Sequence, residues 1–110
     1  MTMAANRLIM INRANDFLHR YPESVYRFDV LFMLGKAFAD LWEFRNDPDM
    51  LAESQRKDPD EARQRAVRYL STVQANVHHL TKLKWEPFCG LALAQLEKSQ
   101  NTGMCFYCCD

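Results

Sequence analysis

Glycine and proline are scarce in this sequence, with three and four residues among 110. Apolar residues make up 48% and charged residues 25%. Low-complexity and disordered chains show the opposite balance, so this composition predicts a globular chain that can form one hydrophobic core. No stretch shows the strict alternation of apolar and polar residues that is typical of β-strands, which excludes a sheet as the main architecture.

A charge excess of either sign is also missing, because 14 Lys and Arg residues balance 14 Asp and Glu residues. Non-specific binding to nucleic acids normally requires a basic excess. Nucleic acid is therefore disfavoured as a partner.

Long apolar runs are absent as well. The most apolar stretch, residues 25–44, is interrupted by five charged residues, whereas a membrane-spanning helix needs roughly 20 apolar positions. Near the start of the sequence, the apolar patch at residues 8–11 is too short for the core of a secretory signal. These features predict a cytoplasmic protein that does not cross a membrane.

Cysteine is present but unevenly distributed. Three of the four cysteines fall within the last six residues, and Cys89 stands apart from them. A disulfide framework spaces its cysteines along the chain, so this layout favours a reducing compartment. We divide the chain into a single helical domain, residues 1–100, and a cysteine-rich tail, residues 101–110.

Apolar residues recur every three to four positions along most of the chain, which is the period of an α-helix. The pattern predicts helices over residues 3–20, 25–44, 59–84 and 88–98. Residues 45–58 are polar and are expected to form a connector with a weak helical turn or two. The predicted fold is all-α, with about four helices in antiparallel hairpins or an irregular helical bundle.

Local signals define the ends of these helices. Ser24 is a good N-cap for the second helix. Asp58, Pro59 and Glu61 combine a cap residue, a proline at the first helical position and a capping box for the third helix. Pro87 is expected to end that helix. Inside the second helix, Gly35 removes a side chain where the first or third helix must approach closely.

The segment from Phe17 to Leu41, FLHRYPESVYRFDVLFMLGKAFADL, resembles the junction between successive tetratricopeptide repeats. A helix ends in Phe-Leu-x-x-Tyr-Pro, and the next helix carries Leu31, then Leu34-Gly35, then the aromatic Phe38. Pro59 lies where this repeat would place its closing proline. The resemblance implies stacked helical hairpins that act as an adaptor for a peptide or helix of another protein.

Exposed aromatic and basic residues are the candidates for a partner-binding surface, because aromatics and arginine dominate the energetics of interfaces. The second helix is apolar nearly all round, and a short chain supplies few helices to cover it, so some apolar surface should stay open. We expect a protein or peptide partner, or a homodimer. The candidate residues are Tyr21, Tyr26, Phe28, Trp42, Arg65 and Arg68.

The cysteines offer an alternative of another class, a small zinc-binding or redox protein. Cys105 and Cys108 form a single CxxC, which Cys109 and Cys89 could extend to four ligands. Neighbouring His78 and His79 are expected to lie in mid-helix and to point about 100° apart, so they cannot both join one site. No phosphate loop or catalytic motif is present in the sequence, which predicts a protein that is not an enzyme and needs no cofactor.

Overall fold

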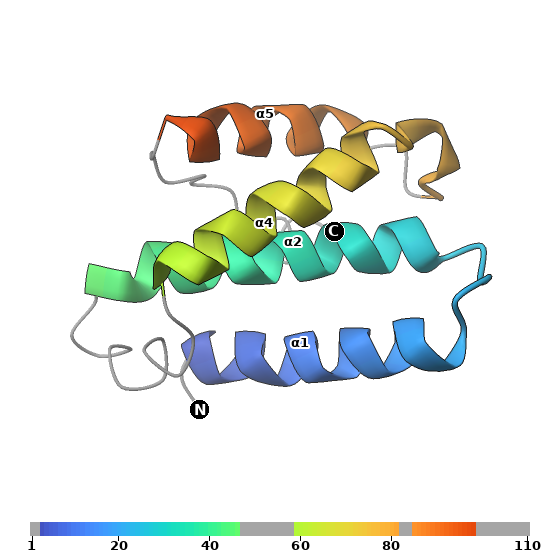
Figure 1. The fold of residues 1–110 in the computed structure, drawn as a ribbon, viewed down its shortest axis with the longest axis horizontal. Coiled ribbons are helices and arrows are strands. Elements are labelled where there is room, and N and C mark those ends of the chain that lie inside the picture. Colours follow the sequence, from blue (N-terminus) through green and yellow to red (C-terminus); the bar gives the residue numbers. More distant parts are fainter. Residues whose placement is uncertain (1–2, 47–58, 82–84, 99–110) are drawn as a thin grey trace.

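The computed structural model describes residues 3–46, 59–81 and 85–98, and the remaining positions lie outside the description. Figure 1 shows the helices in this part of the chain, and no strand occurs in it. The all-α prediction is confirmed. The α-helices are α1 (Met3–Arg20), α2 (Arg27–Glu43), α4 (Pro59–Gln74) and α5 (Glu86–Glu97), and the short 3-10 helices are η1 (Phe44–Asn46) and η2 (Val77–His79).

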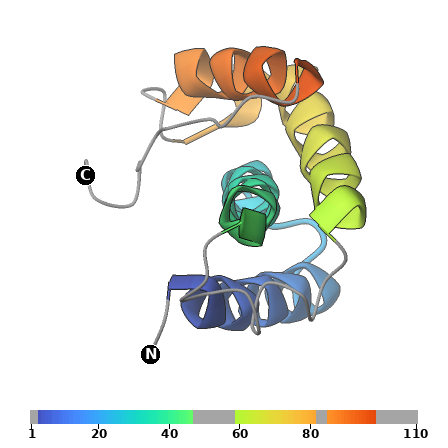
Figure 2. The ribbon, with the colours of Figure 1, turned by 90° about the vertical axis from the view of Figure 1, so that its left-hand side faces the viewer.

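Helix α2 lies at the centre of the molecule. Seen end-on in Figure 2, α1, α4 and α5 form an arc around it. The main contacts join α2 to α1, α2 to α4, and α4 to α5. Within the described ranges, no helix combines the length and the apolar character that crossing a bilayer requires.

The turn between α1 and α2 differs from the prediction at Ser24. This residue is not the N-cap of α2, since the helix begins at Arg27 and its N-cap is Tyr26. Instead, the Ser24 hydroxyl accepts a hydrogen bond from the Tyr26 amide at 3.1 Å, and the Ser24 carbonyl accepts one from the Arg27 amide at 3.1 Å. The serine shapes the connecting turn rather than capping the helix, because its side chain bonds to the backbone two residues ahead.

The expected long helix over residues 59–84 is wrong, because α4 ends at Gln74. The Asn76 side chain donates a hydrogen bond to the Thr72 carbonyl at 2.8 Å, while the Asn76 amide donates to the Val73 carbonyl instead. The asparagine side chain thus bonds to the carbonyl that would otherwise receive its own amide in a continuing helix. Pro87 does not end a helix either, since it lies in the first turn of α5, where a proline needs no amide partner.

A long-range contact fixes the chain after η2. Asp29, in the first turn of α2, accepts hydrogen bonds from the Thr81 amide at 3.0 Å and from the Thr81 hydroxyl at 2.6 Å. The two residues are 52 positions apart. This contact connects the segment that leads towards α5 to the start of the central helix.

Gly35 lies at a close helix crossing, as predicted, and the partner is α4. A Cβ atom at this position would lie 2.9 Å from Cγ and Cδ2 of Leu70 and 3.3 Å from Cβ of Tyr69. Leu70 is fully buried among other core residues. Beside the crossing, the rings of Phe38 and Tyr69 stack with their centroids 5.8 Å apart.

The interface between α1 and α2 contains a buried group of charges. The Asp40 carboxylate accepts a hydrogen bond from Arg7 Nε at 2.6 Å and another from Lys36 Nζ at 2.8 Å. All three residues are buried. Lys36 and Asp40 are four residues apart on α2, so they share one helix face, and Arg7 approaches that face from α1.

We predict that Gly35→Leu destabilises the protein by about 1–3 kcal/mol, because the new side chain overpacks the crossing with α4. The measurement is the free energy of unfolding in urea, followed by circular dichroism. Gly90→Ala is the matched control. Its Cβ would meet Gln74 Oε1 at an ordinary 3.4 Å, so the gain in helix propensity should leave stability unchanged or raised. Equal stabilities for Gly35→Leu and the parent would contradict the crossing.

We also predict that Asp40→Leu costs about 3–5 kcal/mol, because it removes the carboxylate that two buried cations contact. The comparison variant replaces Arg7 and Lys36 by Met together with Asp40→Leu. The triple variant should lose less free energy of unfolding than Asp40→Leu alone, because the three buried charges are removed together. Urea unfolding of both proteins measures the difference, and a triple variant less stable than the single one would argue against this ion-pair group.

Candidate partner-binding groove

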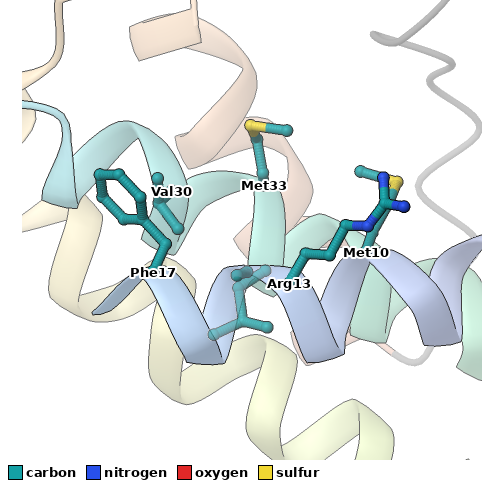
Figure 3. Close-up of a pocket in the computed structure, with 7 residues that line it drawn as sticks. Met10, Arg13, Phe17, Val30 and Met33 are labelled. Atoms are coloured by element: carbon teal, nitrogen blue, oxygen red, sulfur yellow. The ribbon is translucent and has the colours of Figure 1, made fainter. Parts of the chain in front are cut away.

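A largely apolar hollow of about 330 Å³ lies between α1 and α2. Figure 3 shows Met10, Arg13 and Phe17 from α1 on one wall and Val30 and Met33 from α2 on the other. Ala14 and Leu34 complete the lining. The spacing of three and four residues on each helix places these side chains on the two facing edges of the pair.

A second, more open hollow of about 540 Å³ adjoins the first at the α1–α2 turn. Phe17 lines both hollows, and its ring centroid lies 5.3 Å from that of Tyr21. We call the two hollows together the α1–α2 groove. The residues that line the second hollow are Phe17, Arg20, Tyr21, Pro22, Glu23, Ser24 and Tyr26.

Large apolar side chains are exposed where the groove meets the turn. Tyr21 is 56% exposed, Val25 66% and Tyr26 57%. These three residues fall within six positions of the sequence, whereas most other large apolar side chains in the described ranges are buried or partly buried. An exposed patch of this kind normally marks a contact site.

The charged residues at the groove differ in whether they form ion pairs. Arg20 pairs with Asp16 at 3.2 Å across one turn of α1. Arg13 and Glu23 are both exposed, and neither forms an ion pair with another residue in the part of the chain that the structure describes. The groove therefore carries a free positive group near one end and a free negative group near the other.

Two of the four aromatic candidates lie in this groove and two do not. Tyr21 and Tyr26 are exposed there, but Phe28 is only 9% exposed and Trp42 only 3%. Phe28 stacks on His79 with ring centroids 5.3 Å apart, and Trp42 lies under the Arg45 guanidinium at 3.9 Å. Both are core residues because α2 is surrounded on several sides, so their expected role in binding does not fit their position.

The arginine candidates lie on α4, away from the groove. Arg65 pairs with Glu61 at 2.8 Å, and Arg68 is exposed. The neighbouring Arg63 donates hydrogen bonds to the backbone carbonyls of Leu96 and Glu97 at the C-terminal end of α5. Basic side chains favour the carbonyl end of a helix, so Arg63 serves the packing of α4 against α5.

Four lining residues are not among the binding residues that the sequence predicts: Arg13, Phe17, Val30 and Met33. Phe17, Val30 and Met33 belong to the apolar faces of their helices, which are expected to form core. The signal that could have found them is the recurrence of apolar residues at three- and four-residue intervals on both sides of a short turn.

The histidine pair differs from the expectation of a mid-helix position. His78 and His79 lie in η2, and their ring centroids are 4.1 Å apart. Adjacent side chains leave a 3-10 turn about 120° apart, so the short distance between the rings comes from the rotamers of the two side chains and not from the turn itself. No group of three or more His, Cys, Asp or Glu residues suited to hold a metal ion occurs among the described positions.

Cys89 is fully buried on α5, where its thiol donates a hydrogen bond to the Leu70 carbonyl at 3.3 Å. Burial raises its pKa from 9.0 to about 11, because the thiolate would lose its hydration. The neutral, inward-facing thiol is a packing residue and does not fit the expected role of a fourth zinc ligand. Cys105, Cys108 and Cys109 lie outside the described residues.

Comparisons of the sequence with protein-family models and curated proteins, and of the fold with solved structures, found no match.

We predict that Cys89 reacts with iodoacetamide at pH 8 roughly 100-fold more slowly in the folded protein than in urea, because the raised pKa lowers the thiolate fraction by about this factor. Reaction in the folded state should accelerate as the pH rises towards 11. Mass spectrometry of the Cys89 peptide gives the rate. Equal rates in the folded and unfolded states would show that the thiol is accessible and ionised.

Proposed function

We propose that this protein is a protein–protein interaction module and that the α1–α2 groove is its docking surface. The observation that carries the proposal is the continuity of an apolar groove with the exposed side chains of Tyr21 and Tyr26, which line its second hollow. The protein acts by binding rather than by catalysis, as an adaptor in the cytoplasm.

The chemistry of the groove suits a peptide or helix. Met10 and Met33 line it, and the flexible thioether side chains of methionine adapt to ligands of irregular shape. Tyrosine contributes a large apolar area together with a hydroxyl group, which makes it a frequent anchor at interfaces. A groove between two antiparallel helices accepts the apolar face of a third helix without requiring a strand edge.

The tetratricopeptide resemblance supports the same class of function. The residues Leu31, Leu34, Gly35 and Phe38 suggest a helical-hairpin adaptor. Under this proposal, the hairpin of α1 and α2 presents the groove, while α4 and α5 cover the opposite side of α2.

The alternative proposal, a zinc or redox function, now depends on Cys105, Cys108 and Cys109. Zinc in the purified protein, measured by elemental analysis, would favour it. A stable fold after addition of a chelator, together with the absence of bound zinc, would remove the zinc function and leave only the redox function of these cysteines to be tested.

We predict that a photoreactive p-benzoylphenylalanine in place of Tyr26 cross-links to a bound protein in cells of the native source. The substitution replaces one exposed aromatic ring by another, so it should preserve the fold. The product is measured by gel mobility and identified by mass spectrometry. Its mass also shows whether the captured chain is a second 12.9 kDa copy or another protein.

The matched control places the same photoreactive residue at Gln64, which is exposed on α4 and lies outside the groove. Cross-links from position 26 but not from position 64 support the groove. Equal cross-linking at both positions, or none at position 26, would contradict it.

A further inference from the structure

We propose that the occupant of the α1–α2 groove is a second copy of this chain, packed in a two-fold dimer. This inference rests on the proposed function and names the partner. Two features support it: the position of two charged residues and the apolar stripe between them.

The groove carries complementary charges near its two ends. Arg13 lines the first hollow, one helical turn before Phe17, and Glu23 lines the second hollow in the turn that follows α1. Both side chains are exposed. Asp16 and Arg20, the nearest residues of opposite charge along the sequence, pair with each other. Arg13 and Glu23 are thus available to groups from outside the protomer.

A two-fold axis would bring these charges together. In an isologous interface, if one residue contacts a second residue across the axis, the second contacts the first in return. With two α1 helices antiparallel and the axis near Phe17, Arg13 of each protomer faces the Tyr21–Glu23 turn of the other. Two equivalent Arg–Glu pairs form, and the guanidinium also lies near an aromatic ring.

The apolar side chains between the charges fit the same arrangement. Phe17 lies between Arg13 and the turn and would meet its own copy near the axis, where aromatic rings pack favourably against each other. Tyr21 and Tyr26 would become covered at the two ends of the interface. A dimer of this kind shields the apolar surface that the isolated protomer exposes.

The occupant of the groove must present an acidic group, apolar side chains and a basic group in the matching order. The second copy supplies it by symmetry. The observations therefore favour self-association over a foreign helix.

The test is charge reversal, with the dimer measured by light scattering across a dilution series of the full chain. Arg13→Glu places like charges at both ends of the interface, and Glu23→Arg does the same with the opposite sign. Each should raise the dimer dissociation constant by about 10- to 100-fold, since two attractive pairs become two repulsive ones. Circular dichroism checks that each variant keeps its helix content.

Two combinations make the test specific. The double variant R13E/E23R restores both pairs and should recover the dimer. Mixing the two single variants should also produce a dimer, because R13E then carries acidic groups at both positions of the interface and E23R carries basic groups at both. Lys98→Glu, a charge reversal at an exposed position after α5, is the control and should leave the dimer unchanged.

The outcomes separate this inference from the proposed function. Weakening by each single variant and recovery in both combinations support the two-fold dimer. A protein that is monomeric at every concentration overturns the inference. So does a dimer whose dissociation constant neither charge reversal changes. If position 26 cross-links to a chain of another mass while the protein stays monomeric, the groove is a docking surface but its occupant is not a second copy.

Discussion

The Asp40 carboxylate constrains how α1 lies on the central helix, because it holds one cation from its own helix and one from α1 inside the protein. A buried charge is costly unless its partner is correctly placed, so α1 can lie against α2 in few orientations. Arg7 is near the start of α1, and the groove is formed by later turns of the same helix. The pair that fixes α1 at one end therefore also determines how its other turns face Val30 and Met33.

On the opposite side of α2, close packing of side chains rather than an ion pair determines how the neighbouring helix lies. Gly35 allows α4 to approach until Leu70 occupies the space of the missing side chain. Helix α5 then packs on α4, where Cys89 bonds to Leu70 and Arg63 holds the last carbonyls of α5. One face of the central helix is thus held by an ion pair and another by close packing, and the groove is lined by residues of α1, of α2 and of the turn between them.

The sequence is informative where one strong physical effect decides the structure. The 3.6-residue period predicts the bounds of α1 and places α2 in the core, and a glycine in an apolar helix indicates a close crossing. It is less informative where tertiary contacts compete with local preference. The apolar stripe of the third helix continues past Gln74, but the Asn76 side chain ends the helix there. Phe28 and Trp42 look like interface aromatics in the sequence, yet only the packing of η2 and Arg45 against them shows that they are covered.

The contact between Asp29 and Thr81 has a consequence for insertions and deletions. It closes a long stretch of chain that includes the polar residues between α2 and α4. The free-energy cost of closing a loop grows only with the logarithm of its length, by about 0.6 kcal/mol for each doubling. Related chains could therefore gain or lose residues in that polar stretch with little loss of stability. A single residue added inside α2 would have a much larger effect, because it would rotate the residues before it by about 100° relative to those after it. Asp29, Gly35 and Asp40 would then no longer face their partners together. Variation in length should therefore concentrate between the helices, while the length of α2 itself stays fixed.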